Sequence, residues 1–316
     1  MKRLALATAF ALALVAAGCT GTNSNTSASS QSSEATQDTA IAQRQGDFAG
    51  LVDIGGGREM YLECRGTGSP TVVLTSGFRG AYDDWTSVVD PADPTDQKPS
   101  DSAVFPEVGS FTRVCAYDRP GTIYTDGTPT TSTPVPQPTA AQDGTADLHT
   151  LLTAAEEPGP YVIVAHSWGG SIGYLFASDY PEEVSGLVLI DSWSEFLQTA
   201  LTPEQWATVA QGAKQLGDPE DLEAADYEAS VDAIRAAPPV GSIPTVVLTS
   251  DKPFDFGAGE GTWPAWLAAQ DQLATLLSAK HITDTNSGHY IAGEQPKLVV
   301  DSIHQVVEAI RNGSSV

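Results

Sequence analysis

Residues 162–170, which read Val-Ile-Val-Ala-His-Ser-Trp-Gly-Gly, constrain the fold of this 316-residue chain more than any other stretch. An apolar run with strand character leads directly into Ser167, and a helix-like stretch follows it. The residues two before and two after the serine, Ala165 and Gly169, are both small. A serine on a sharp strand-to-helix turn needs such neighbours, because larger side chains would collide with the adjoining strand and helix. The stretch therefore predicts a strained turn from which the Ser167 hydroxyl projects as a nucleophile.

Short apolar runs alternate with helix-like stretches from Gly46 onward, and this alternation is typical of an α/β fold. The runs are rich in Val, Ile and Leu, as strands covered on both faces should be. We therefore expect an eight-stranded, mostly parallel sheet with helices on both faces. The expected strands are 51–54, 59–64, 71–75, 113–117, 161–165, 186–190, 245–249 and 280–283, and the expected helices are 140–155, 168–180, 265–278 and 295–311.

Three segments exceed a minimal repeat of strand and helix. Residues 86–110 are rich in Pro, Asp and Ser, and residues 128–139 form a second, Pro- and Thr-rich loop. Loops of this length in a compact domain usually carry function or are mobile. The third segment, about 192–240, is expected to form a small cap between the sixth and seventh strands.

The N-terminal residues indicate export. Residues 1–18 combine two basic residues with an apolar run of signal-peptide length, and small residues precede Cys19. This pattern predicts a signal peptide over 1–18 and lipidation of Cys19, which would anchor the chain to the membrane outside the cytoplasm. An ordinary secretory signal, with Cys19 incidental, is the alternative. Residues 19–45 read as a flexible tether, because they are polar and carry few large apolar side chains. The folded domain is then 46–316.

Charge and ligand patterns exclude several classes of function. The 15 basic and 40 acidic residues give a formal net charge of −25, which disfavours binding to nucleic acid. The histidines are scattered, without the spacing of metal ligands, and there is no phosphate-binding glycine loop. We therefore expect neither a metal nor a cofactor, and a small molecule as the partner.

A serine nucleophile needs a base, and His289 is the best candidate among five histidines. It follows the last expected strand, and Gly288 lets the loop turn closely, which predicts an imidazole at the carboxyl edge of the sheet near Ser167. His166 is expected to be structural, because its position in the turn points it away from the nucleophile. The others, His149, His281 and His304, lie in expected helices or strands.

Acyl transfer also needs two backbone donors for an oxyanion. The N–H of Trp168, directly after the nucleophile, is the first candidate. Residues 75–80, Thr-Ser-Gly-Phe-Arg-Gly, follow the third strand and offer the N–H of Phe78 as the second. A simple glycine loop is the alternative for this segment taken alone.

These residues together resemble the α/β-hydrolase family over nearly all of 46–312. The resemblance rests on Ser-Gly-Phe-Arg-Gly at 76–80, Tyr-Asp-Arg-Pro-Gly at 117–121, the serine turn, residues 187–191, and Ser-Gly-His at 287–289. Many relatives carry histidine where this chain has Ser76. The resemblance implies that the second strand lies beside the fourth, which would make Cys64 and Cys115 cross-strand neighbours. A disulfide between them is therefore expected rather than two buried free thiols.

The acid that would orient His289 is harder to assign. The family usually places it after the seventh strand, where Pro253 occupies the matching position in this chain. Some relatives carry it at the end of the sixth strand, and here that position is Asp191. We favour Asp191, with Asp255 and Asp251 as alternatives, since a carboxylate there can fix the tautomer of the imidazole. Asp191 as a helix cap is the structural alternative.

The predicted activity is hydrolysis of small carboxylic esters, lactones included, through an acyl-enzyme. An aminopeptidase-like amide hydrolase of the same fold and a non-catalytic binding lipoprotein remain as alternatives. Aromatic residues in and after the cap could line an apolar pocket or fasten the cap to the core, and they are Trp193, Phe196, Trp206, Trp263 and Trp266.

Overall fold

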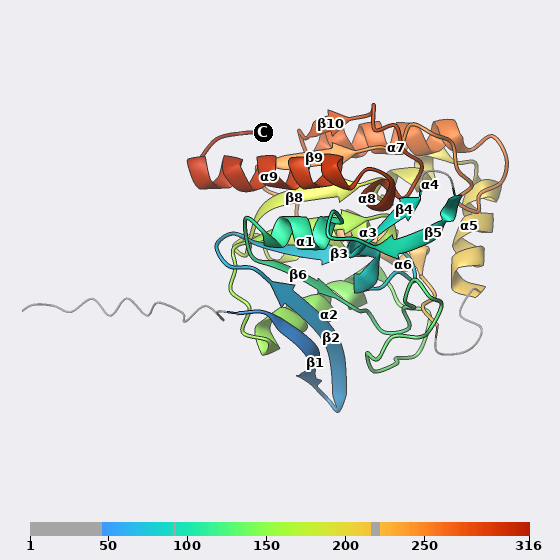
Figure 1. The fold of residues 1–316 in the computed structure, drawn as a ribbon. Helices are drawn as coiled ribbons and strands as arrows, with labels where there is room; N and C mark the ends of the chain where they lie inside the picture. The colour runs from blue at the N-terminus through green and yellow to red at the C-terminus, as the bar shows by residue number, and fades with distance from the viewer. Residues whose placement is uncertain (1–45, 91–92, 216–221) are drawn as a thin grey trace, which may run out of the picture. The chain divides into compact units, whose positions relative to one another are not determined.

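The computed structural model describes residues 46–90, 93–215 and 222–316. Within them, eight strands form one sheet in the order β1-β2-β6-β3-β7-β8-β9-β10 (Figure 1). β1, β2 and β6 are paired antiparallel, and the pairs from β6 to β10 are parallel. The strands are β1 Phe48–Gly55, β2 Arg58–Arg65, β3 Thr71–Thr75, β6 Val114–Tyr117, β7 Tyr161–His166, β8 Val184–Ile190, β9 Thr245–Leu248 and β10 Lys280–Ile282. The expected eight-stranded, mostly parallel sheet is confirmed.

The central strands bury both of their faces, which explains their continuous apolar sequences. Along β3, Val72 and Leu74 face one core, while Val73 between them faces the other. This alternation follows from the two-residue period of a strand, whose successive side chains point to opposite faces. Consecutive apolar residues such as these therefore supply two cores at once.

Helices cover both cores. α2 and α3 pack together over one face of the sheet, and α1 packs beside α9 over the other (Figure 1). On α9, Val299, Ile303 and Val306 recur at helical spacing and are fully buried. The helices are α1 Val104–Gly109, α2 Ala141–Ala154, α3 Trp168–Asp179, α4 Phe196–Ala200, α5 Pro203–Gln215, α6 Tyr227–Ala236, α7 Trp263–Leu276, α8 Ile291–Glu294 and α9 Pro296–Asn312, with a 3-10 turn, η1, at Tyr82–Trp85.

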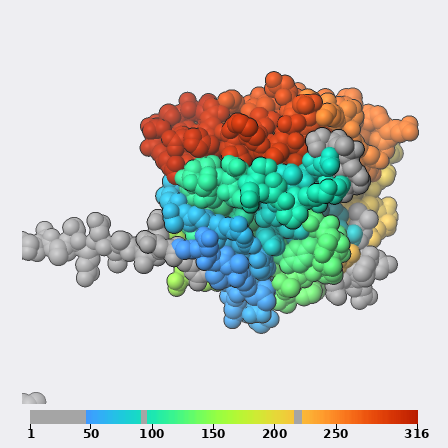
Figure 2. Space-filling model, in the orientation of Figure 1, coloured from blue at the N-terminus to red at the C-terminus, as the bar shows by residue number. Residues whose placement is uncertain are grey.

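The 86–110 insertion contains regular structure that its sequence does not suggest. Strands β4, Ser87–Asp90, and β5, Asp93–Pro99, form an antiparallel hairpin, and α1 follows. The hairpin contacts α8, where a Cβ added to Gly293 would lie 2.7 Å from the Val89 side chain. Figure 2 shows the teal residues of this region directly beside the red C-terminal residues. The insertion thus reaches the segment that follows His289.

The segment between β8 and β9 carries α4, α5 and α6. Its buried residues, among them Trp193 and Trp206, belong to the same apolar cluster as α3 and α7. Trp193 and Trp206 therefore fasten this segment to the core of the domain. Its treatment as a separate cap remains a prediction.

A disulfide joins β2 to β6. Cys64 and Cys115 face each other directly in the antiparallel register, with their Cα atoms 4.0 Å apart, and both are fully buried. The bond links two segments that lie 51 residues apart in the sequence.

The predicted signal peptide, Cys19 and the tether to residue 45 lie outside the described residues. Among the residues that are described, no helix combines the length and the apolar character needed to cross a membrane.

Candidate active site

Ser167 occupies the sharp turn between β7 and α3. Its backbone has φ 51° and ψ −123°, a strained conformation for a residue with a side chain. The glycines that follow make the turn possible. A Cβ at Gly169 would lie 2.4 Å from the carbonyl oxygen of Ser76, and one at Gly170 would lie 1.7 Å from Oγ of Ser192. The turn is therefore wedged between the ends of two neighbouring strands, which fixes the direction of the Ser167 hydroxyl.

His289 lies within hydrogen-bond distance of Ser167, with 2.9 Å between His289 Nε2 and Ser167 Oγ. Its Nδ1 is 2.6 Å from Oδ2 of Asp191. Because a carboxylate only accepts, Nδ1 carries the proton and Nε2 is free to accept from the serine hydroxyl. The ring of Phe254 stacks on the imidazole at a centroid distance of 4.2 Å. The structure thus brings together the three residues predicted for this chemistry.

Asp191 is fully buried at the end of β8 and has φ 41°. Both carboxylate oxygens are occupied. Oδ1 accepts from the backbone N–H of Ser250 at 3.0 Å and from the indole N–H of Trp266 at 2.9 Å. Oδ2 accepts from the Ser250 hydroxyl at 2.8 Å and from His289. Four hydrogen bonds thus satisfy a carboxylate that would be costly to bury without partners.

The two alternative acids make other hydrogen bonds. Asp251 accepts from the backbone N–H groups of Asn286 and Ser287, each at 2.9 Å, and so shapes the loop that leads to His289. Asp255 is exposed and accepts from the Gly257 N–H at 2.8 Å. Among the three candidate acids, the structure places Asp191 on the imidazole.

His166 forms a hydrogen bond with the backbone of the loop that carries His289. Its Nε2 lies 2.9 Å from the carbonyl oxygen of His289, and since a carbonyl only accepts, Nε2 donates. Burial, followed by the influence of His289, lowers the pKa of His166 to about 3. The ring is therefore neutral at ordinary pH and acts as a fixed donor.

The loop after β3 touches the serine turn. A Cβ at Gly77 would lie 2.8 Å from Nδ1 of His166 and 3.2 Å from Cβ of Ser167. Phe78 follows directly, and in the described part of the chain its backbone N–H forms no hydrogen bond. The Trp168 N–H is among the first donors of α3, which have no partner within the helix. Both predicted oxyanion donors thus lie in segments that meet at Ser167.

Ser167 and His289 line a cavity of about 440 Å³. Its wall is mostly aromatic, with two acidic groups, Asp255 and Glu294. A neighbouring cavity of about 340 Å³ shares Gly288 and Glu294 with it and extends to Val89 and Asp90 of β4. The aromatic residues are Trp193, Tyr227, Phe254, Phe256, Trp266 and Tyr290.

A metal site is not evident in the described residues. Cys64, Cys115 and Glu157 place potential ligand atoms within 4.8 Å of one another. Both sulfur atoms are consumed by the disulfide, and it is the thiolate that binds metal ions.

Sequence reasoning missed two contributors to this site. Ser250 follows β9 at the carboxyl edge of the sheet, a position that could have drawn attention to it. Trp266 lies on α7 and donates to Asp191 across 75 residues of sequence, and nothing in the local pattern indicates this role.

Curated relatives match parts of the chain. An uncharacterized protein of Schizosaccharomyces pombe is 32% identical over 147 residues, which cover 43% of this chain and 26% of that protein. A putative carbamate hydrolase, RutD, of Yersinia enterocolitica is 33% identical over 137 residues, 42% of this chain and 41% of the relative. The chain thus spans about a quarter of the length of the first relative and two fifths of the second.

Solved structures match nearly the whole described domain. An esterase from Thermogutta terrifontis aligns with a TM-score of 0.54 at 17% identity, covering 83% of this chain and 99% of the esterase. Est816, described as an N-acyl homoserine lactone degrading enzyme, aligns with a TM-score of 0.56 at 17% identity, covering 82% of this chain and all of that one. Residues 70–217 match the family model described as alpha/beta hydrolase fold. With the sheet order and the strand–serine–helix turn, these matches establish that the chain has the α/β-hydrolase fold.

Proposed function

We propose that this chain is a serine hydrolase that cleaves carboxylic esters, lactones included, through an acyl-enzyme. The observation that carries the proposal is the hydrogen-bonded chain from Ser167 Oγ through His289 to Asp191, with distances of 2.9 and 2.6 Å. This arrangement activates a weak hydroxyl nucleophile. A cavity of about 440 Å³ beside it, lined by aromatic rings, suits an apolar acyl or alcohol group.

The proposed reaction has two halves. Ser167 Oγ attacks the ester carbonyl while its proton passes to Nε2 of His289, and the N–H groups of Phe78 and Trp168 stabilise the oxyanion. Collapse expels the alcohol, which takes the proton from His289. Water then attacks the acyl-enzyme, giving its proton to His289, which returns it to Ser167 as the acid leaves. Asp191 holds the imidazole and stabilises its charged form.

A fluorophosphonate probe tests this proposal, because it reacts covalently with an activated serine. We expect stoichiometric labelling of the wild-type chain and none of Ser167→Ala. Ser185→Ala is the matched control, since its hydroxyl donates to the Tyr161 carbonyl within the sheet and lies outside the cavity. A folded wild-type protein that stays unlabelled and hydrolyses no p-nitrophenyl ester contradicts the proposal. The chain would then be assigned as a non-catalytic binding protein.

An amide hydrolase that accepts a free amine is the second candidate. Asp255 and Glu294 line the same cavity as Ser167, and carboxylates there can hold a cationic amine. Amino-acid p-nitroanilides compared with p-nitrophenyl esters decide between the two. A higher kcat/KM for the anilides that falls in Glu294→Gln, with ester hydrolysis retained, favours the amide hydrolase.

We further propose that the chain is exported and anchored outside the cytoplasm through a lipid on Cys19. The buried disulfide supports an oxidising compartment, because such bonds are rare in the cytosol. Metabolic labelling with an alkyne fatty acid should mark the wild-type protein and leave Cys19→Ser unmarked. Labelling of both proteins, or of neither, contradicts the anchor.

A further inference from the structure

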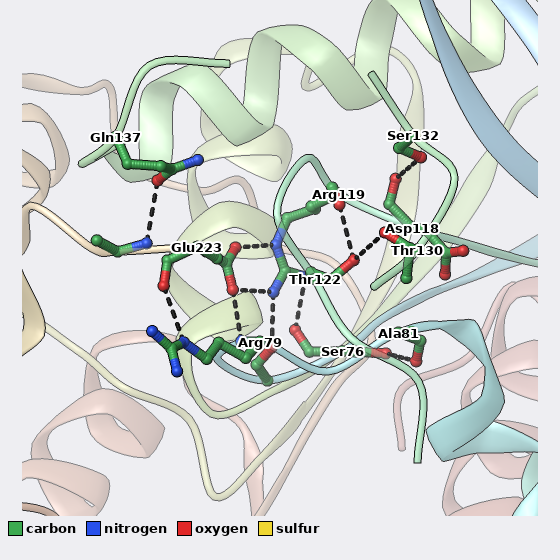
Figure 3. A network of polar contacts seen from close by, with 12 residues as sticks. Ser76, Arg79, Ala81, Asp118, Arg119, Thr122, Thr130, Ser132, Gln137 and Glu223 are labelled. Carbon is green, nitrogen blue, oxygen red and sulfur yellow. Dashed lines mark hydrogen bonds and ion pairs between the residues drawn. The ribbon is translucent and has the colours of Figure 1, made fainter. Parts of the chain in front are cut away.

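A buried arginine binds the loop that carries Phe78. Arg119 lies just after β6 and is 3% exposed. One arm of its guanidinium donates to the carbonyl oxygen of Ser76 at 2.9 Å, and the other donates to that of Gly77 at 2.6 Å (Figure 3). Two successive peptide units of the loop are therefore held by one rigid, planar group.

A glutamate from the segment between α5 and α6 completes the arrangement. Glu223 is 2% exposed, and its carboxylate accepts from Arg119 at 2.7 and 3.0 Å. The same carboxylate accepts from the backbone N–H of Arg79, and the Glu223 carbonyl accepts from Arg79 Nε at 3.1 Å (Figure 3). Arg119 therefore holds the residues before Phe78, and Glu223 holds Arg79, the residue after it.

Peptide geometry links these contacts to the Phe78 N–H. The Gly77 carbonyl and the Phe78 N–H belong to one planar trans peptide unit, so they point in opposite directions. Because the carbonyl points at Arg119, the N–H points away from it. Gly77 lies against His166 and Ser167, and the N–H is the group that the proposed reaction requires there.

We propose that Arg119 and Glu223 are positioning residues for the oxyanion hole. They fix the peptide between Gly77 and Phe78 so that its N–H stabilises the transition state. This inference rests on the proposed esterase function. Glu223 comes from the predicted cap segment, so the placement of that segment sets the catalytic rate and not only the shape of the cavity.

The chain contains a matched control pair. Arg113 and Glu157 also form a buried, bidentate ion pair, with both distances 2.7 Å. Arg113 also donates to two backbone carbonyls, those of Gly46 and Gly66. Arg113 directly precedes β6, whereas Arg119 follows it, so the two pairs lie at opposite ends of that strand. Both pairs have the same chemistry and burial, but only the pair of Arg119 and Glu223 contacts the loop that carries Phe78.

The first experiment compares Glu223→Gln with Glu157→Gln in the full chain. Each change keeps the side-chain shape and removes the charge, so each should lower the melting temperature. We expect kcat for a p-nitrophenyl ester to fall about tenfold or more in Glu223→Gln, with KM within roughly threefold, because only transition-state stabilisation is lost. In Glu157→Gln, kcat should stay within about twofold, since no group near Ser167 moves. Equal losses of kcat in both variants identify a general effect of stability and overturn the proposal.

A boronic acid that forms a tetrahedral adduct with the serine gives an independent reading. Its affinity should fall in Glu223→Gln by the same factor as kcat/KM, whereas the pH dependence of kcat/KM should keep its wild-type shape, because His289 and Asp191 are untouched. Unchanged boronate affinity overturns the positioning role.

If Glu223→Gln does not fold, the same comparison of kcat is made between Arg119→Lys and its control, Arg113→Lys. Lysine keeps the charge but lacks the planar fork that holds two carbonyls together. We expect the same selective loss of kcat in Arg119→Lys. An inactive, unlabelled wild type defeats the proposed function itself, whereas an active wild type with unimpaired Glu223→Gln and Arg119→Lys defeats this inference alone.

Discussion

The indole N–H of Trp266 donates to Oδ1 of Asp191 at 2.9 Å, and the other oxygen of that carboxylate accepts from His289. A tryptophan on α7 thereby holds the carboxylate that holds the imidazole. The contact is fully buried, where a hydrogen bond to a charged group is strong and its loss is not compensated by water.

Trp266→Phe should therefore lower kcat while preserving the fold. A hydrogen bond to a charged group contributes about 1.5–3 kcal/mol, which corresponds to a loss of roughly 10- to 100-fold if the whole effect falls on the transition state. Trp263→Phe is the control, because Trp263 lies on the same helix, contacts the ring of Phe254 and does not itself line the Ser167 cavity. Steady-state ester hydrolysis measures both, and equal kcat values for the two variants would contradict the role of Trp266.

Asp191→Asn should impair activity far more than either alternative acid. With asparagine, the imidazole loses the partner that fixes its tautomer, and a fall in kcat of about 10⁴ is expected. Asp255→Asn should stay within about threefold for a p-nitrophenyl ester, because Asp255 accepts from the Gly257 N–H while Asp191 holds the imidazole of His289. Asp251→Asn should weaken the loop of His289 and give an intermediate loss. If Asp255→Asn or Asp251→Asn proved the more damaging, the acid would have to be reassigned.

Removal of the disulfide should lower stability without changing the chemistry. Cys64→Ala combined with Cys115→Ala opens a covalent link over 51 residues, and a loss of about 2–4 kcal/mol in the free energy of unfolding is expected. Urea denaturation with and without reductant measures it. The folded double variant should keep the wild-type kcat, because neither residue lines the cavity. A stability that does not respond to reductant in the wild type would show that the bond does not form.

Asp118 should make the stability of the protein depend on pH. Burial raises the pKa of its carboxyl to about 7, against 3.8 as the ordinary value. Between these values the folded chain holds a proton that the unfolded chain has released. The stabilisation is therefore complete below about pH 4 and is lost as the pH rises through 7.

Asp118→Asn tests this dependence, because asparagine keeps an acceptor for the Tyr82 N–H and does not ionise. The variant should gain stability relative to wild type between pH 4 and pH 8, by roughly 2–4 kcal/mol. Denaturant unfolding at several pH values gives the comparison. Parallel stability curves for the two proteins would exclude a raised pKa.

The sheet could be predicted because its strands are buried on both faces. Every residue of Thr71–Thr75 is buried, and its apolar centre, Val72–Leu74, fills two cores by the alternation of its side chains. The hairpin of β4 and β5 gave no such signal. The β5 sequence, Asp-Pro-Thr-Asp-Gln-Lys-Pro, contains no large apolar residue, so its pairing depends on β4, which contacts α8, rather than on a pattern of its own.

Some residues of the candidate site could likewise be predicted from the sequence, and others could not. Ser167 and His289 stand out because each combines a reactive side chain with a local glycine pattern at the end of a strand. The contacts that hold Asp191 and the loop of Phe78 do not stand out. Glu223 reaches Arg119 across 104 residues, and Trp266 reaches Asp191 across 75. Such contacts are set by the way helices and connecting segments pack on the finished sheet, and no short window of sequence contains both partners.

The bond from His166 to the carbonyl of His289 has a mechanical consequence. His166 is the residue next to the serine, and the carbonyl belongs to the residue that takes the proton of the serine. A displacement of the end of β7 is therefore transmitted directly to the backbone of His289. The hydrogen bond couples the positions of the oxygen and the nitrogen between which the proton travels.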